Sequence, residues 1–489
     1  MLPQIRWISR RKDIFYTGAV QQTGLSSLFQ PNEQPAHQSR SIGMLSPILS
    51  FSLTLSTIAS VTADNMTLAL VQVIWRHGDR SPTLTHPSDP IQENDWKFGG
   101  GGWGQLSPIG MKQHFNFGKQ LRKRYVDTGF LSKTYNSKEI YVRSTDYNRT
   151  IISSMSNLLG MYTYNNTASV KGTDYPDVQG WPAGFIPIAV HTVEHDTDHL
   201  LIPHAPCHRM SWLFEMLRNQ SDEVREYLGR EDVKGIFANV TAKAGGVYDE
   251  KNIWEVRDVW KIEQVHYPER LKKVDWYSEK LYNKLAEISD KISLFDNGIY
   301  ERGPVSINGL DVGLELQKIR GGSLINDLNK RMYMKYDCLN RQHEAQCRWI
   351  KNLKYLIYSA HDTTVFAFLN VMGIQSEVAK GEYPDYTAAA FVELYTNAGG
   401  EPYFKILYRP SDKNETIYSV THFVPDCGGK EYCKLDVFNK RAERVKPDQN
   451  MIEWCEVNPW GSAIGDSSST VLSITSFASI LISYLWSHS

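Results

Sequence analysis

The sequence lacks an excess of charge of either sign. Its 489 residues hold 53 Lys and Arg against 54 Asp and Glu, a formal net charge of −1. Residues 1–63 contain five of the basic and two of the acidic residues, so the remainder balances 48 basic against 52 acidic residues, a net charge of −4. Nucleic-acid binders present a strongly basic surface, and the composition therefore disfavours that class of protein.

Internal repeats and long low-complexity tracts are also absent. A repeat architecture is therefore not expected. The length suffices for one large or two modest globular domains with a buried core.

Cysteine is scarce, but the six cysteines form an even set that lies wholly after residue 200. In an oxidising compartment they can form three disulfides, with fifteen connectivities possible in principle. The spacings favour two local loops and one long-range pair: Cys338 with Cys347, Cys427 with Cys433, and Cys207 with Cys455. Acceptor sequons for N-glycosylation, which point to the same secretory route, occur at Asn65, Asn148, Asn165, Asn219, Asn239 and Asn414.

Two apolar stretches lie near the ends of the chain. Residues 44–63 end in small residues, as a cleaved signal peptide does. We expect Met44 to be the true start, with residues 1–43 a mispredicted or alternative extension. Residues 471–486 follow a linker at 457–470 and are short for a membrane span. They fit either a single span or a signal for a glycolipid anchor, and a buried terminal helix is the third interpretation. We expect a protein attached to the membrane at the cell surface or in the lysosome, or a secreted one.

Early in the chain, a buried strand ends abruptly in a cluster of charges. Residues 68–75 are almost continuously apolar, as in a parallel strand covered on both faces. Arg76, His77 and Arg80 follow at the carboxyl end, the edge where open α/β sheets bind ligands. Two guanidinium groups can each bind two oxygens of one phosphate, and Gly78 lets the backbone approach that phosphate closely. The pattern predicts an anion site; a solvated surface turn is the alternative.

Two further strands are expected to end at the same edge. Residues 139–142 form a short strand that leads to Arg143. Residues 354–360 form another apolar run, followed by His361 and Asp362. An imidazole and a carboxylate at a helix amino terminus can donate a hydrogen bond to an anion and a proton to a leaving group.

Amphipathic segments alternate with these strands. Ser107 and Pro108 are typical of an N-cap and a first helical residue, and residues 144–146 offer a cap for a helix through Leu159. Residues 205–309 combine charges and aromatics at helical spacing and predict a mainly helical insertion beside the site.

The expected architecture is an α/β core with a mainly parallel central sheet flanked by helices. The core would combine residues 64–204 with residues 310–456, and the smaller α-helical domain of residues 205–309 would be inserted between them.

One competing motif belongs to zinc chemistry. Residues 191–195, HTVEH, match the H-x-x-E-H pattern of certain zinc peptidases. That chemistry needs both histidines on one face of a helix, whereas residues 186–190 are typical of extended chain. A zinc site is therefore not favoured.

Three motifs taken together resemble one family. RHGDRSP at 76–82, RSTDYNRT at 143–150 and YSAHDTT at 358–364 are similar, in this order, to the histidine acid phosphatases of the prostatic and lysosomal type. The resemblance extends over residues 66–456 and implies an α/β core with a smaller helical domain. One departure is that the family carries a cysteine in the strand corresponding to residues 388–395, where this chain has none.

The resemblance also implies the roles of individual residues. His77 would be the nucleophile that forms a phosphohistidine, and Asp362 would protonate the leaving oxygen. No metal or other cofactor is implied, the substrate would be a small phosphomonoester, and a homodimer is possible. The phosphoryl oxygens would be held by Arg76, Arg80, Arg143 and His361.

Three functional classes follow from this reading. The first is an acid phosphatase that hydrolyses phosphate monoesters. A phosphoryl-transfer mutase is the second, and it is disfavoured by the His-Asp pair and by the secretory features. The third is a catalytically silent surface binding protein, which would require a blocked pocket because every candidate catalytic residue is present.

Overall fold

The computed structural model describes residues 66–163, 166–341, 344–380 and 382–461. The chain divides into two units, Met1–Ser60 and Val61–Ser489, and all described residues belong to the second. The expected signal peptide, the C-terminal apolar segment, Asn65 and Asn165 lie outside the described residues. Among those that are described, no helix is both long and apolar enough to cross a membrane.

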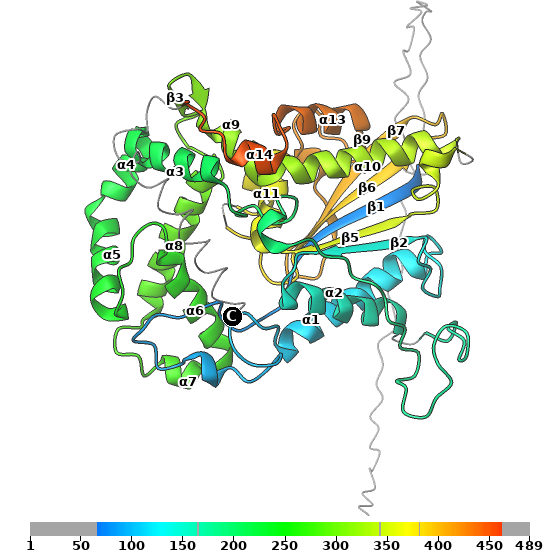
Figure 1. The fold of residues 1–489 in the computed structure, drawn as a ribbon, viewed down its shortest axis with the longest axis horizontal. Coiled ribbons are helices and arrows are strands. Elements are labelled where there is room, and N and C mark those ends of the chain that lie inside the picture. Colours follow the sequence, from blue (N-terminus) through cyan, green and yellow to red (C-terminus); the bar gives the residue numbers. More distant parts are fainter. Residues whose placement is uncertain (1–65, 164–165, 342–343, 381, 462–489) are drawn as a thin grey trace, which may run out of the picture. The chain divides into compact units, whose positions relative to one another are not determined.

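A mixed seven-stranded sheet forms the core (Figure 1). Its order is β2-β5-β1-β6-β7-β8, and β9 pairs with β7. Only β2, β5 and β1 pair in parallel, and the other neighbours are antiparallel. The strands are β1 Thr67–Arg76, β2 Ile140–Ser144, β5 Tyr355–Ala360, β6 Ala389–Thr396, β7 Pro402–Arg409, β8 Tyr418–Ser419 and β9 Cys433–Lys434, with a separate hairpin of β3 Ser306–Ile307 and β4 Leu310–Asp311.

The α/β class is confirmed, but the sheet is mixed rather than mainly parallel. The chain enters β6 at the edge where β1 ends, since Ala389 pairs with Trp75, so β6 runs antiparallel to β1. A short turn that contains Gly399 and Gly400 then returns the chain antiparallel as β7. The parallel half carries the ends of the three charged motifs.

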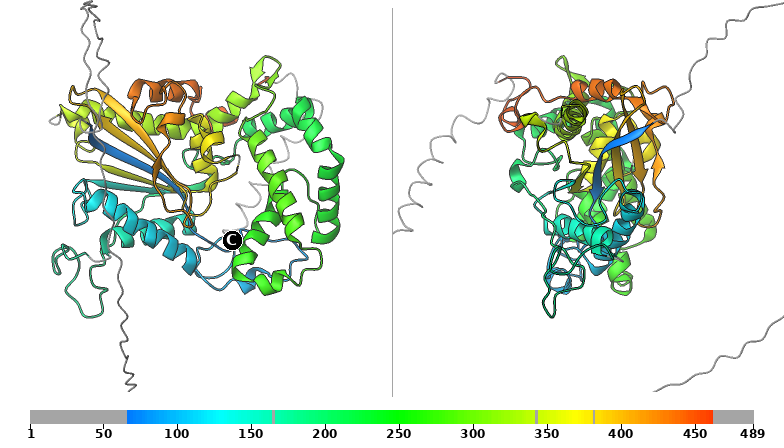
Figure 2. Two further views of the ribbon diagram at one scale, coloured as in Figure 1. Left: turned by 180° about the vertical axis from the view of Figure 1, so that it is seen from behind. Right: turned by 90° about the vertical axis from the view of Figure 1, so that its right-hand side faces the viewer.

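Strand β1 lies at the centre and is covered on both faces, as its apolar sequence predicts. From Leu70 to Arg76 no residue is more than 4% exposed. Leu70 and Ile74 pack with residues of α10 (Ser323–Leu339), α11 (Asp362–Val371) and α13 (Leu435–Arg444), whereas Val71 and Trp75 pack with residues of α1 (Pro108–Leu121) and α2 (Asn148–Leu158). Figures 1 and 2 show these two helical layers on opposite sides of the sheet.

The helices form two groups, those of the core and those of the inserted region. Those that cover the sheet or border it are α1 Pro108–Leu121, α2 Asn148–Leu158, α9 Val312–Gln317, α10 Ser323–Leu339, α11 Asp362–Val371, α12 Gln375–Val378, α13 Leu435–Arg444 and α14 Met451–Cys455. Those of the inserted region are α3 His208–Gln220, α4 Asp222–Gly229, α5 Glu231–Ala244, α6 Ile253–His266, α7 Pro268–Leu271 and α8 Glu279–Asp296. Helices α5 to α8 pack around a cluster of their own that includes Val240, Trp260 and Leu285. Helix α3 packs instead with α9 and α14, through residues that include Leu213, Leu316 and Trp454.

Helix α2 begins later than the sequence suggests. Its N-cap is Tyr147, not one of residues 144–146. Ser144 and Thr145 instead continue the edge of the sheet, since their N–H groups donate to the carbonyl oxygens of His191 and Ser359 at 2.8 and 3.1 Å. The delayed start determines which arginine reaches the site.

All three expected disulfides are present: Cys207–Cys455, Cys338–Cys347 and Cys427–Cys433. The first joins the start of α3 to the end of α14 across 248 residues. A crosslink over so long a loop restricts the unfolded chain most strongly.

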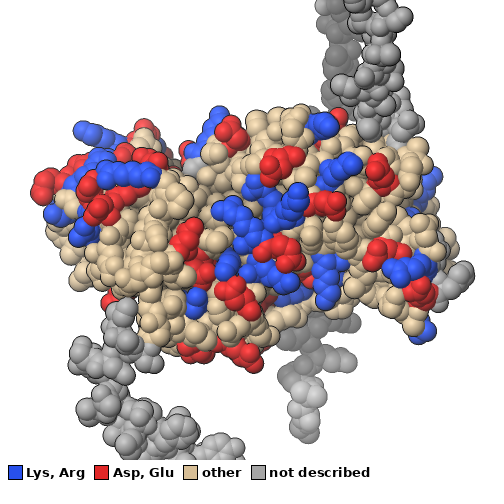
Figure 3. Space-filling view, turned by 90° about the horizontal axis from the view of Figure 1, so that it is seen from above, with Lys and Arg blue, Asp and Glu red and all other residues tan. Residues whose placement is uncertain are grey.

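The face above α10 and α13 carries basic side chains near its middle, with acidic side chains interspersed (Figure 3). The last turn of α13 supplies Arg441 and Arg444, and Lys318 pairs with Asp448 at 2.9 Å. Neither sign of charge occupies the whole of this face.

Candidate active site

The parallel pairing of β1 with β5 brings two of the motifs together. Arg76 is in register with Ala360, and the His77 N–H donates to the Ala360 carbonyl oxygen at 3.1 Å. His77 and His361 therefore leave adjacent strand ends, and their ring centroids lie 5.6 Å apart. Both side chains are buried, with 2% and 4% of their residues' surface exposed.

The turn after β1 is fixed by a close approach of two glycines. A Cβ atom on Gly78 would lie 2.5 Å from the Gly110 carbonyl oxygen, so no other residue fits without backbone movement. Asp79 accepts a hydrogen bond from the hydroxyl of Ser107, which caps α1, and pairs with His266 of α6 at 2.6 Å. The turn is thus held by α1 on one side and by the helical region on the other.

The surroundings of His77 keep its imidazole neutral with a defined tautomer. Its Nδ1 lies 2.8 Å from the Gly78 carbonyl oxygen, which can only accept, so Nδ1 carries the proton and Nε2 keeps its lone pair. Burial, and then the positive charges of Arg149, Arg76 and Arg80, hold the pKa of His77 well below its usual range. A buried neutral imidazole with a free Nε2 is a competent nucleophile even in acid.

Three guanidinium groups surround this imidazole. Arg76 donates to the Pro384 carbonyl oxygen at 2.8 Å and pairs with Asp362 at 3.0 Å. Arg80 pairs with Asp258. The buried Nε–H groups of Arg76, Arg80 and Arg149 have no hydrogen-bond acceptor among the residues that the structure describes. Buried donors normally find partners, and three cationic donors beside one imidazole suit an oxyanion.

Arg149, which sequence reasoning missed, has the place expected for Arg143. Among the charges that depress the pKa values of His77 and His361, Arg149 acts most strongly. Burial and the neighbouring Arg80 lower the pKa of Arg149 itself to about 10, which reflects crowding of like charges that a bound anion would relieve.

Arg143 has other contacts. Its guanidinium pairs with Asp198 at 2.7 Å, and both groups are nearly buried. Because strand side chains alternate between faces, Arg143 projects on the same side of β2 as Tyr141, which packs against the α10 and α11 cluster. Arg149, the second residue of α2, was recognisable only as a cation near a helix amino terminus that follows a strand, a position that favours anions.

Asp362 is the first residue of α11, and His361 is its N-cap. Burial alone would raise the pKa of Asp362, but the charges of Arg76 and Arg80 and the hydrogen bond from the Thr363 N–H lower it below its ordinary value. His361 lies with its Nε2 3.0 Å from the Thr145 hydroxyl, beside the Tyr147 ring.

Other side chains at the site had no signal in the sequence. Tyr386 lies under the Arg76 guanidinium, 4.4 Å from carbon to ring centroid. Helix α6 contributes Asp258, which pairs with Arg80, and Lys261, which pairs with Asp385 at 3.2 Å. Their positions depend on packing of the helical region against the core.

The H-x-x-E-H segment does not form a helix face. His191 stacks on Tyr141 at 4.8 Å and pairs with Arg143 through the backbone, whereas His195 contacts Tyr147 and Asp196. Within the described part of the chain, no three His, Cys, Asp or Glu side chains gather as a metal site would require.

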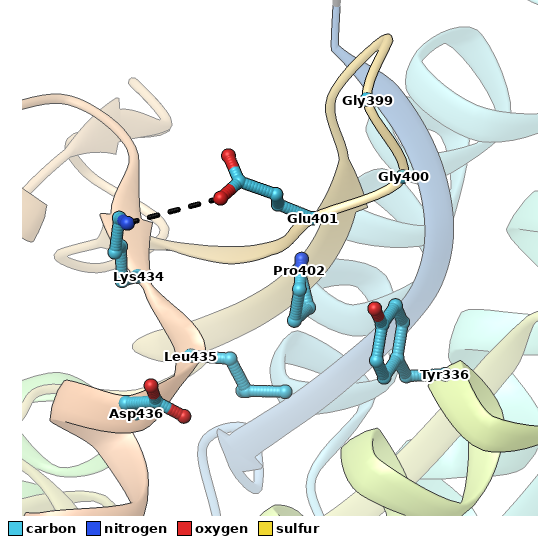
Figure 4. A pocket seen from close by; sticks show the side chains of 8 residues that line it. All are labelled: Tyr336, Gly399, Gly400, Glu401, Pro402, Lys434, Leu435 and Asp436. Atoms are coloured by element: carbon cyan, nitrogen blue, oxygen red, sulfur yellow. Dashed lines mark ion pairs between the residues drawn. The ribbon is translucent and has the colours of Figure 1, made fainter.

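A surface pocket at the opposite end of the sheet offers no comparable chemistry (Figure 4). It lies by the β6–β7 turn, since Thr396 pairs with Thr67 at the start of β1 and with Pro402. Its charged lining includes Lys434 and Glu401, whose charged atoms lie 3.9 Å apart.

The fold and the site together define an α/β protein with a helical insertion and a buried histidine among three arginine side chains. The model of the histidine phosphatase superfamily, branch 2, matches residues 67–409, and the chain belongs to this family. The resemblance inferred from the three motifs is thereby confirmed.

Proteins named as acid phosphatases are similar to this chain over most of its length. The chain is 32% identical to human lysosomal acid phosphatase over 384 residues, which cover 78% of each chain. It is 32% identical to mouse prostatic acid phosphatase over 386 residues, 78% of this chain and 86% of that protein. Among solved structures, the Hafnia alvei phytase in complex with tartrate superposes with a TM-score of 0.56 at 15% identity, over 81% of this chain and 100% of that one, which shows the shared fold alone.

Proposed function

We propose that this protein is an acid phosphatase that hydrolyses phosphate monoesters through a phosphohistidine on His77, with Asp362 as the proton donor. The observation that carries the proposal is the group of three unpartnered, buried Nε–H donors around the neutral imidazole of His77. Arg76, Arg80 and Arg149 hold the phosphoryl oxygens, with His361 beside them.

In the first step, Nε2 of His77 attacks phosphorus while the bond to the ester oxygen breaks. The proton of Asp362 passes to that oxygen, so the alcohol leaves neutral. Charge on the equatorial oxygens is met by the three guanidinium groups.

In the second step, water attacks the phosphohistidine and the nitrogen–phosphorus bond breaks. The carboxylate of Asp362 accepts the proton of that water, which restores both residues and releases inorganic phosphate. Every proton and bond is accounted for by side chains of this chain and water.

Activity is expected to be highest in acid. The pKa of His77 is depressed, so the imidazole stays neutral and active well below pH 6.5. The pKa of Asp362 is also depressed, so the free carboxyl is ionised near pH 5 and its proton must arrive with the substrate monoanion. Since the second phosphate proton dissociates near pH 6, kcat/KM should fall about tenfold per pH unit above about pH 6. A pH profile of kcat/KM from 3 to 8 tests this assignment. A loss of activity toward low pH with a midpoint near 6.5, or an optimum above pH 7, would contradict it.

Arg149 and Arg143 are expected to differ sharply when replaced. Arg149→Ala removes a cation beside His77 and should lower kcat/KM about 100-fold or more, with little change in melting temperature. Arg143→Ala leaves the buried Asp198 without its partner, so it should lower the melting temperature while kcat/KM stays within a few-fold of wild type. Steady-state kinetics and thermal melts of both variants show which arginine binds phosphate. The opposite pattern would assign phosphate binding to Arg143.

The first test of the function is phosphate release from 4-nitrophenyl phosphate by residues 64–460 secreted from eukaryotic cells. Acid-favoured release that is indifferent to a chelator supports the proposal. Silence from a folded protein favours the binding role. Transfer of the phosphoryl group to an added alcohol or sugar phosphate in preference to water favours the mutase.

We further propose the secretory route and membrane attachment through residues 471–486. The disulfides support an oxidising compartment. Asn148, Asn219, Asn239 and Asn414 are exposed, as glycan acceptors must be. A homodimer stays a prediction for size-exclusion chromatography.

A further inference from the structure

A carboxylate from the helical region lies against one of the three site arginines. Asp258 of α6 accepts hydrogen bonds from both terminal nitrogens of Arg80, at 3.0 and 3.1 Å. The Arg80 side chain is 8% exposed and that of Asp258 17%. Phosphoryl groups bind arginine by the same two-point contact, so Asp258 takes from Arg80 two of the donors that an oxyanion could use.

The charge of Asp258 has no place in the two chemical steps. Asp362, which pairs with the site arginine Arg76, donates and accepts a proton. Lys261, another polar residue of α6 that meets the core, pairs with Asp385 at 3.2 Å. The charge of Asp258 therefore acts on the site through Arg80.

We propose that Asp258 sets the anion affinity of the pocket. By offsetting the charge of Arg80, it makes the pocket hold a phosphoryl group loosely enough to release inorganic phosphate, and it disfavours substrates that carry further phosphates near the one cleaved. This inference deepens the proposed function and rests on it.

The alternative is that Asp258 only holds Arg80 in place, and the two roles have opposite consequences. A neutral side chain of the same shape keeps a hydrogen bond to Arg80 but removes the repulsion between the carboxylate and the bound anion. A unit charge about 6 Å from a phosphate changes its affinity by about ten- to a hundredfold at the effective dielectric of a protein site. Loss of mere support would instead weaken anion binding.

The test is inhibition by inorganic phosphate during hydrolysis of 4-nitrophenyl phosphate near pH 5. In Asp258→Asn the inhibition constant should fall about tenfold, whereas Asp258→Glu, which keeps the charge, should stay near the wild-type value. If the Asn variant fails to fold in thermal melts, Asp258→Ser removes the same charge and carries the same expectation.

Asp290 provides a matched control. It forms a two-point pair with Arg257 of α6 at 2.6 and 3.2 Å, and its side chain is 17% exposed, like that of Asp258. Asp290→Asn removes an equivalent ion pair from the same helical region without touching a site arginine. Its inhibition constant for phosphate should equal that of wild type.

A second readout addresses substrate class. The ratio of kcat/KM for myo-inositol hexakisphosphate to that for 4-nitrophenyl phosphate should rise severalfold in Asp258→Asn, because repulsion grows with the charge of the substrate. An inhibition constant that rises or stays unchanged in Asp258→Asn would overturn the inference, and an unchanged ratio would overturn its substrate part. Failure of the wild-type enzyme to hydrolyse 4-nitrophenyl phosphate would instead refute the proposed function, before any variant is compared.

Discussion

His77→Ala is expected to abolish phosphate release from 4-nitrophenyl phosphate, with kcat at least about 10,000-fold lower. The variant lacks the nitrogen that forms the covalent intermediate, and no neighbour can take over. His361, another imidazole at the site, has its Nε2 engaged with the Thr145 hydroxyl at 3.0 Å. Stopped assays of purified protein near pH 5 measure the loss. The arginines remain, so the variant should still bind inorganic phosphate.

The fold should survive this change. The His77 side chain makes one hydrogen bond, to the adjacent Gly78 carbonyl oxygen, and its removal relieves a buried group held among three cations. We expect a melting temperature within a few degrees of wild type. His191→Ala is the matched control, because that ring is exposed and stacks on Tyr141; it should keep full activity. A fully active His77→Ala would refute the phosphohistidine mechanism.

The meeting of His77 with His361 could be predicted from the sequence because it depends on local patterns and one topological rule. Each residue follows an apolar run of strand length, and parallel strands present their carboxyl ends at the same edge of a sheet. The observed register, with Arg76 opposite Ala360, satisfies that rule directly. The antiparallel half of the sheet did not follow from it, because hairpin pairing depends on the short turn after β6.

Arg143 shows where strand-end reasoning stops. A strand end fixes the edge of the sheet but not the face on which a side chain projects, and Arg143 projects toward Asp198. Two more residues of extended chain, Ser144 and Thr145, then displace the helix start, so that Arg149 reaches His77 instead. Only the backbone pairing of those residues with His191 and Ser359 reveals the displacement.

Asp258 was beyond sequence reasoning for a different reason. It lies 178 residues from Arg80, in a helix whose pattern indicates only amphipathic packing. Which of its polar residues faces the core depends on how the helical region docks against the turn after β1, including the His266 contact with Asp79. Long-range docking of this kind leaves no local signature.

Asp362→Asn is expected to slow poor leaving groups far more than good ones. For an alkyl ester such as glycerol 2-phosphate, whose alkoxide is too basic to leave unprotonated, kcat/KM should fall about 1,000-fold. For 4-nitrophenyl phosphate, whose phenolate is stable as an anion, the fall in the first step should be about tenfold or less. The asparagine keeps an acceptor for the Thr363 N–H, so the local backbone is retained. Parallel assays of the two esters give the ratio directly.

The ratio of the two losses in kcat/KM distinguishes proton donation by Asp362 from a purely electrostatic effect of its charge. Asp362 also neutralises Arg76 at 3.0 Å, and loss of that pairing alone would change both esters by the same factor. Asp385→Asn provides the comparison, because its carboxylate lies by the site and pairs with Lys261 but is assigned no proton transfer; it should alter both rates equally. Since Asp362 also accepts the proton of the attacking water, 4-nitrophenyl phosphate should give a burst of nitrophenol and an accumulated, alkali-stable phosphoenzyme in Asp362→Asn. Equal losses for the two esters, without a burst, would assign Asp362 to holding Arg76 and leave the proton donor to be sought elsewhere in the pocket.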